Sequence, residues 1–265
     1  MASKLRRTSR DLLLNYLKYY GWTLLGILVF SALIAGMNHY ETLADVLGFA
    51  PLSFITVMVS MVFALYTYSD FKYLIQNGVS RKTYWRGKAL ALLALAFIQV
   101  VCNWILRLVV QIPLMAVSNQ HSYSTELVNY NQTNFFFNNF YSPHAKVGTW
   151  QLIIYSAICG LILAVMLYYA AMAVGAIFSL MTRKLQLITS IAGMVIGIYL
   201  LAQLAYWLDS HANMHQVMNS TFNLLFGVNS GLPHVLVAEI WMIVAIIIEA
   251  VISYYVMKFL KLRTD

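Results

Sequence analysis

The side chains in this sequence that are most informative about chemistry are ionisable residues inside long apolar segments. Arg107, Glu239 and Glu249 all lie within such segments. A charged side chain costs about 2.5–3.5 kcal/mol at the centre of a membrane helix, so each is a candidate for function. Glu249 lies between Val235 and Lys258, near the middle of its segment. We expect it to form either a structural hydrogen bond or a contact with a substrate or proton.

Arg107 and Glu239 lie closer to the same boundary of their segments and could pair at matching depth. Such a pair is either a structural tie between two helices or part of a substrate path. Amide side chains inside the apolar segments are weaker candidates of the same kind: Asn103, Gln111 and Gln203. Pro113 follows in the segment of Arg107, and we expect it to kink the outer end of that helix.

Motifs for enzymatic chemistry are missing from the sequence. It contains no HExxH motif and no phosphate-binding GxxxxGK[ST] motif, so the chain has no such route to hydrolysing ATP by itself. His211 and His215 are four residues apart and would share a helix face, but two ligands make an incomplete metal site. We predict no catalytic residue, no metal and no cofactor on this chain.

Composition points to a membrane protein, because 61% of the 265 residues are hydrophobic and only 10% are charged. Soluble domains contain about 25% charged residues. About 20 apolar residues cross a bilayer, and within lipid they must be helical. We therefore predict an all-α polytopic fold that forms a single transmembrane domain over residues 1–265, with external loops at 118–149 and 209–234. The six predicted spans are Tyr20–Met37, Phe49–Tyr68, Ala89–Val117, Trp150–Met181, Leu187–Leu208 and Val235–Leu260.

Basic residues predict the orientation, because loops rich in lysine and arginine stay in the cytoplasm. The N-terminal tail, the loop at 69–88, the turn after the fourth span and the C-terminal end contain 15 of the 17 basic residues. Both termini are therefore predicted to be cytoplasmic, in a plasma membrane. The net charge of +8 is explained by this placement, and we predict no nucleic-acid partner.

Two cytoplasmic segments have amphipathic patterns. In residues 1–19, Leu12 and Tyr16 share one face while Arg7 and Lys18 share the other, as in a helix that lies on the membrane before the chain turns into the first span. The alternative is a basic tail that only sets orientation.

The loop at 69–88 predicts a short helix that Ser69 caps and that Asn77–Gly78 ends, followed by a helix that Ser80 caps. Its apolar patch of Phe71, Leu74 and Ile75 would be exposed, so we expect a partner protein or lipid to cover it.

These features resemble the membrane permease subunits of type 2 ATP-binding-cassette (ABC) exporters, in particular the small six-span permeases of Gram-positive bacteria. The resemblance rests on the basic N-terminal helix, the loop FKYLIQNGVSRKTYWRGKAL and six spans with cytoplasmic ends. In that family the corresponding loop contains the coupling helix, which fits a cleft on a separate ATPase subunit. The resemblance implies coupling residues Asp70, Phe71, Tyr73, Leu74, Ile75, Asn77, Gly78 and Arg81.

The resemblance also implies ATP and Mg on the partner subunit and pairing with a second permease copy or a sister permease. The apolar run at 221–233 fits the short re-entrant element of the family. An amphipathic, lipid-like or peptide substrate suits the apolar spans. The alternative function is an ATP-independent secondary transporter or substrate-capture subunit that uses Glu249. A sensory or immunity protein on the same fold has the same sequence features.

Overall fold

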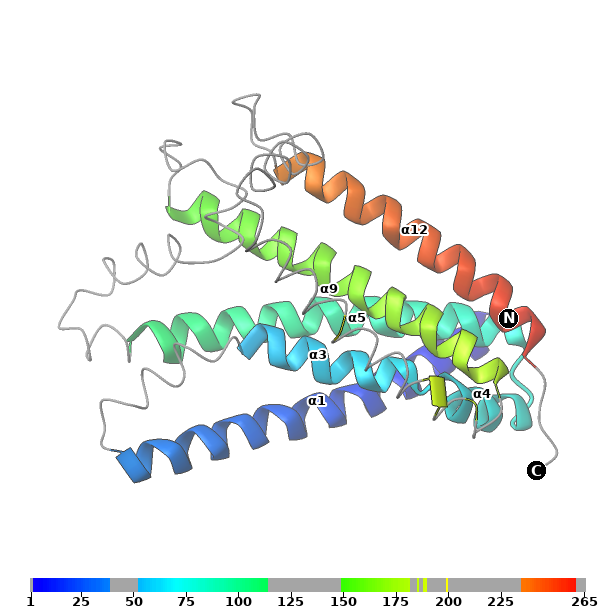
Figure 1. Cartoon of the computed structure of the whole chain (residues 1–265), viewed down its shortest axis with the longest axis horizontal. Coiled ribbons are helices and arrows are strands. Elements are labelled where there is room, and N and C mark those ends of the chain that lie inside the picture. The colour runs from blue at the N-terminus through cyan, green and yellow to red at the C-terminus, as the bar shows by residue number, and fades with distance from the viewer. Residues whose placement is uncertain are drawn as a thin grey trace.

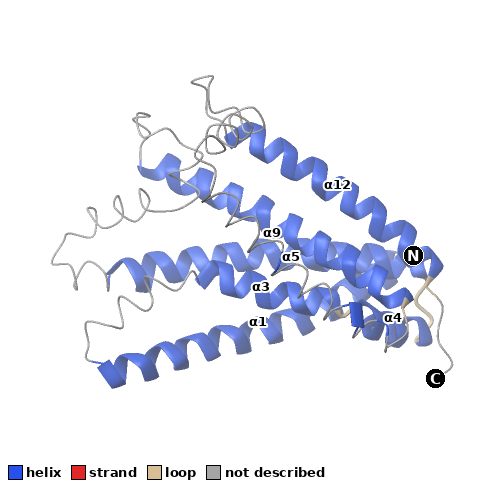
Figure 2. Ribbon diagram, in the orientation of Figure 1, coloured by secondary structure: helices blue, strands red, loops and turns tan. Residues whose placement is uncertain are grey.

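The computed structural model describes residues 2–38, 52–113, 149–181 and 235–260, together with positions 185, 188, 189 and 199. Helices dominate these parts, and no strand occurs among them (Figure 2). The α-helices are α1 (Ala2–Asn38), α3 (Leu52–Leu65), α4 (Thr67–Gln76), α5 (Arg81–Leu106), α9 (Thr149–Leu180) and α12 (Val235–Phe259). A π-helical segment, η1 (Arg107–Gln111), continues α5.

Four described helices are long and apolar enough to cross a membrane, which indicates a multi-pass membrane protein. The qualifying segments are Lys4–Val29, Arg81–Val109, Ala157–Leu180 and Glu239–Phe259. The predicted second span appears as α3, whose 14 residues extend for about 21 Å, short of a hydrocarbon core of about 30 Å. The predicted fifth span, Leu187–Leu208, lies outside the described residues except for isolated positions.

The boundaries of α9 and α12 agree within one residue with the predicted fourth and sixth spans. The helix of the third predicted span starts at Arg81, before Ala89, as the predicted cap at Ser80 requires. Near the C-terminal end of this helix the hydrogen-bond pattern changes to the π form, in which the backbone N–H of Ile112 donates to the Arg107 carbonyl. Pro113 follows directly and has no N–H to continue an α-helical ladder, which explains the irregularity at this place.

All five long elements have one end near α4 (Figure 1). The start of α1, the start of α5 and the ends of α3, α9 and α12 meet there. The guanidinium of Arg81 donates to the Lys258 carbonyl at 2.8 Å and so joins the start of α5 to the end of α12. α9 ends at this end of the bundle, and α12 begins at the opposite end. The predicted fifth span, which would connect the two ends, is consistent with this arrangement.

The first helix differs from the prediction. We expected an interfacial helix over residues 1–19 and a turn before the first span, but α1 continues without a break to Asn38. The two faces are as expected, since Leu12, Tyr16 and Tyr20 are buried while Arg7 and Lys18 are exposed. The buried face packs along α5 in the same direction, so the bundle covers this face instead of the membrane surface.

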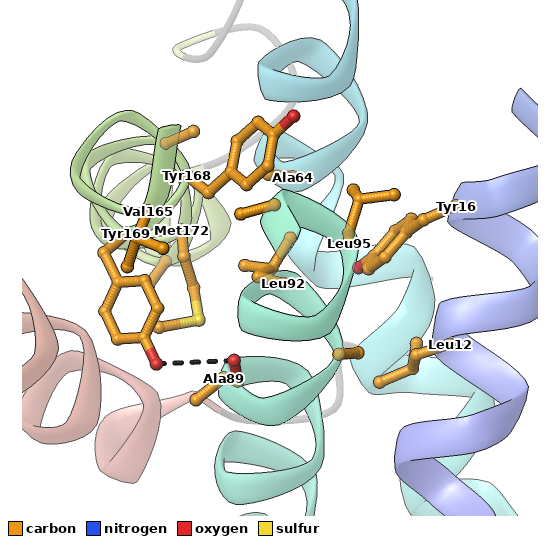
Figure 3. Packing of buried hydrophobic residues seen from close by; sticks show 14 of the residues in the cluster. Leu12, Tyr16, Ala64, Ala89, Leu92, Leu95, Val165, Tyr168, Tyr169 and Met172 are labelled. Atoms are coloured by element: carbon orange, nitrogen blue, oxygen red, sulfur yellow. Dashed lines mark hydrogen bonds between the residues drawn. The ribbon is translucent and has the colours of Figure 1, made fainter. Parts of the chain in front are cut away.

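The main core lies where α1, α3, α4, α5 and α9 meet (Figure 3). Leu92 and Leu95 of α5 lie between Leu12 on α1 and the tyrosines of α9. Tyr169 on α9 donates its hydroxyl to the Ala89 carbonyl at 3.3 Å, which gives a buried tyrosine its polar partner. α12 packs mainly on α9 at the edge of this core.

Candidate functional site

The candidate site is α4 together with the residues that hold it, which we call the α4 junction: Tyr16, Thr67, Asp70, Phe71, Leu74, Tyr84 and Lys88. α4 begins after a break at Tyr66, which has no side-chain cap. The prediction that Ser69 caps this helix is wrong, because its hydroxyl already lies inside α4 and donates to the Tyr66 carbonyl at 3.4 Å. The predicted second span therefore ends at Leu65, not at Tyr68.

The predicted stop at Asn77–Gly78 is confirmed. Gly78 has a φ of 76°, the left-handed conformation that glycine adopts without steric cost. Its N–H donates to the Ile75 carbonyl at 3.0 Å, and the N–H of Val79 donates to the Leu74 carbonyl at 3.0 Å. This pair of bonds is the Schellman arrangement, which satisfies carbonyls that the helix end leaves open.

The predicted cap of the following helix is also confirmed. The Ser80 hydroxyl accepts the N–H of Thr83 at 3.2 Å, and α5 begins at Arg81. Only residues 77–80 therefore separate α4 from α5, and both helix ends beside this link are capped. α4 is held rigidly between two longer helices.

The apolar face of α4 is not exposed, which corrects the prediction of a patch waiting for a partner. Phe71 and Leu74 are 1% and 8% exposed, and Ile75 is partly buried. The ring of Phe71 meets the edge of Tyr84 on α5, with ring centroids 5.6 Å apart. The sequence pattern located the amphipathic helix correctly, but α5 and α9 pack against it and cover its apolar side.

A buried ion pair fixes the same face. Lys88 is completely buried, and its ammonium lies 3.6 Å from Asp70 Oδ2 and donates to Thr67 Oγ1 at 3.1 Å. The hydroxyl of Tyr16 on α1 donates to the same Asp70 oxygen at 3.0 Å. Tyr84 completes the set by donating to the Thr67 carbonyl at 2.9 Å. The junction thus links α1, α4 and α5 through polar contacts.

Sequence reasoning missed the roles of Lys88, Tyr16 and Tyr84. Lys88 was counted among the basic residues of the loop at 69–88, and no contact was predicted for Tyr84. The available signal was that an apolar run, ALALLALAF, follows Lys88 directly, so Lys88 lies at the boundary of the apolar segment. A lysine in that place needs an acidic partner, and Asp70 is the acid within the same loop.

The outer face of α4 is polar and open. Tyr73 is 69% exposed, and Gln76, Asn77 and Gly78 are exposed beside it. Of the residues expected to couple, Asp70, Phe71 and Leu74 therefore face the bundle, while Tyr73, Asn77 and Gly78 face away. Arg81 is engaged with the end of α12.

The polar candidates inside the apolar helices have different environments. Asn103 is buried, accepts the Tyr20 hydroxyl at 3.1 Å and donates to Thr56 Oγ1 at 3.2 Å, so it ties α5 to α1 and α3. Arg107 lies over the Trp104 ring at 4.7 Å. The pairing of Arg107 with Glu239 stays a prediction.

Glu249 is partly buried on α12, and its Oε2 atom has no hydrogen-bond partner within the described part of the chain. Gln99 is a second buried polar group, and its Oε1 accepts the Tyr168 hydroxyl. The roles proposed for Glu249 stay predictions. His211 and His215 lie outside the described residues, as do the external loops.

Comparison of the chain with protein-family models, curated proteins and solved structures gives no match.

Proposed function

We propose that this chain is the membrane permease subunit of an ATP-driven exporter of the type 2 ABC kind, in which α4 transmits movement from a separate ATPase subunit. The observation that carries the proposal is the construction of α4. It is a short helix at one end of the bundle, with one face locked to α1, α5 and α9 and the other face open. A force applied to the open face reaches three long helices directly.

The contact with the ATPase is assigned to the outer face of α4, centred on Tyr73. A tyrosine that is 69% exposed gives a large contact area at low entropic cost, as is typical of residues that dominate protein interfaces. Phe71 and Leu74 face the bundle and attach α4 to it. A second permease subunit, either another copy of this chain or a sister permease, completes the transporter.

Purification with the ATPase tests the proposal. Membranes are solubilised in gentle detergent, and an ATPase subunit is expected to copurify with the parent chain. Tyr73→Asp is expected to reduce this recovery by about tenfold or more, since the loss of a central interface residue costs about 2 kcal/mol. Tyr73→Phe keeps the ring and is expected to retain the partner.

The fold is checked separately for each variant by its thermal unfolding. Recovery of the parent chain without any ATPase would refute the proposal, and full recovery with Tyr73→Asp would refute the assigned face. Phe71→Asp is expected to unfold the protein, because it places a charge in the core.

A second candidate function rests on Glu249, whose Oε2 atom is buried and lacks a hydrogen-bond partner within the described helices. In this alternative the chain moves protons or a coupled substrate without ATP. Proteoliposomes that contain a pH-sensitive dye inside would then show proton entry without ATP, and Glu249→Gln would abolish it. Absence of proton entry with the parent chain would exclude uncoupled proton movement through Glu249.

A further inference from the structure

A groove of about 590 Å³ lies between α5 and α12, a size common for small-molecule sites. Its lining comes from the first two turns of α5 and the second half of α12. The contact between Arg81 and Lys258 lies just beyond it, at the end of the molecule where α4 lies. The groove is open along its side, and it is separate from the outer face of α4.

Two positive charges mark one end of the groove. Lys82 and Arg86 are one helical turn apart on α5, and both are exposed. Within the described helices neither has an acidic partner. Asp11 lies next to arginines of its own helix, and Asp70 is paired with Lys88. No acidic side chain of the described helices therefore neutralises the charge at this end of the groove.

Two aromatic side chains that contact each other, Trp85 and Tyr254, line the groove next to these charges. The indole N–H of Trp85 donates to Ser253 Oγ at 3.0 Å, and its ring meets the edge of Tyr254 with centroids 5.2 Å apart. The Ser253 hydroxyl donates in turn to the Ala250 carbonyl at 2.9 Å. Amphipathic rings prefer the headgroup level of a bilayer, so these two side chains place the charged end of the groove at that level.

The remaining lining is apolar and continues toward the middle of α12. Ile246, Ile247 and Val251 form this part, and Ile247 is 57% exposed. From Tyr255 to Ile246 the groove extends for about 14 Å along the helix axis. Its polarity therefore changes from cationic at the end of the bundle to hydrocarbon-like at depth.

We propose that this groove binds an anionic phospholipid, with the phosphate between Lys82 and Arg86 and an acyl chain along Ile246 and Val251. The charge complementarity selects an anion, and the apolar continuation selects one with a hydrocarbon chain. Both helices are apolar enough to cross the membrane, so lipid is the molecule that surrounds this open face. Basic pockets between membrane helices bind anionic headgroups in this way.

Native mass spectrometry of the full chain tests the site. The protein is taken from vesicles of equal parts phosphatidylcholine and phosphatidylglycerol, and retained lipid is identified. The double variant Lys82→Gln/Arg86→Gln is expected to retain phosphatidylglycerol about tenfold less than the parent chain, since each basic residue contributes appreciably to headgroup attraction. The matched control Lys4→Gln/Arg6→Gln removes the same charge from exposed positions and is expected to behave like the parent.

A second measurement places the lipid in the groove. The protein is placed in phosphatidylcholine vesicles that contain either brominated phosphatidylglycerol or brominated phosphatidylcholine, and tryptophan fluorescence is measured. The contribution of Trp85 to the quenching is the difference between the parent chain and Trp85→Phe. Stronger quenching by the brominated phosphatidylglycerol is expected. Equal quenching by both lipids, or equal lipid retention by the double variant and the parent, would overturn the proposal. Failure of both lipids to quench would also overturn it, by showing that a second protein surface covers the groove.

Discussion

At the scale of single residues, the burial of the charged Lys88 side chain has a large free-energy cost. Removing an ammonium from water costs several kcal/mol, and only close, hydrogen-bonded partners offset that cost. Asp70 and Thr67 are those partners, and Tyr16 holds the carboxylate in position. A buried pair of this kind contributes little net stability compared with apolar side chains of the same size. We infer that its effect is to favour one arrangement of α1, α4 and α5 over others.

This reasoning predicts a large penalty when one partner is removed. Asp70→Ala leaves the Lys88 charge buried without its counter-ion, and we expect it to lower the free energy of unfolding by about 3–5 kcal/mol. The double variant Asp70→Ala/Lys88→Met removes both charges and is expected to recover more than half of that loss. Thermal unfolding in detergent, followed by circular dichroism, measures both changes.

The control for this prediction is the exposed pair of Arg7 and Asp11, whose charged atoms are 4.0 Å apart. Asp11→Ala is expected to change stability by less than about 1 kcal/mol, because exposed ion pairs are weak. A loss for Asp70→Ala as small as that for Asp11→Ala would contradict the burial of Lys88. A double variant that is no more stable than Asp70→Ala would also contradict the burial of Lys88.

The same residues show what the sequence could and could not predict about the site. Gly78 and Ser80 were predictable because each acts through its own backbone neighbours, and the structure confirms both. The burial of Phe71 was not predictable, because an amphipathic pattern reveals that one face is covered but not by what. Lys88 was misjudged for a related reason. A lysine near a helix start is usually a solvated charge, and the sequence does not show which side chains from other helices surround it.

At the scale of elements, α9 approaches the break between α3 and α4 closely. A Cβ at Gly175 would lie 2.5 Å from the Leu65 carbonyl oxygen and 2.7 Å from Thr67 Oγ1. Leu65 is the last residue of α3, and Thr67 is the first of α4. A glycine at this place allows α9 to touch the backbone of the break directly, as small residues do between membrane helices.

Gly175→Ala is therefore expected to destabilise the protein by about 1–3 kcal/mol, since the obstacle is backbone and cannot rotate away. Gly160→Ala in the same helix is the matched control, because nothing lies within 4 Å of a Cβ there. It is expected to be neutral or to stabilise by up to about 1 kcal/mol through helix propensity. Thermal unfolding compares the two, and equal effects would contradict the close contact at Gly175.

Element positions were predicted more successfully than element partners. Hydropathy located α9 and α12 within one residue, because a long apolar run in lipid has only the helix available to it. The pattern of residues 1–19 was equally clear, yet its buried face was assigned to the membrane surface. An apolar helix face has the same sequence pattern whether lipid or α5 covers it. The continuity of α1 past residue 20 follows from the packing of Leu12, Tyr16 and Tyr20 on the bundle.

At the scale of the whole molecule, the start of α1, α4 and the end of α12 lie at one end (Figure 1). That arrangement gives physical meaning to the distribution of charge. The described basic residues of the tail, of the loop at 69–88 and at Lys258 are at the same end of the structure. Because loops rich in lysine and arginine tend to stay in the cytoplasm, we propose that this end faces the cytoplasm.

The orientation is tested by single cysteines at three exposed positions of this end, made by Lys4→Cys, Gln76→Cys and Lys258→Cys in a chain whose Cys102 and Cys159 are replaced by alanine. A maleimide that cannot cross membranes is added to intact cells and then to permeabilised ones. All three cysteines are expected to react only after permeabilisation. Different behaviour among the three would contradict the shared end. Reaction of all three in intact cells would reverse the orientation, and α4 would then be out of reach of any cytoplasmic ATPase.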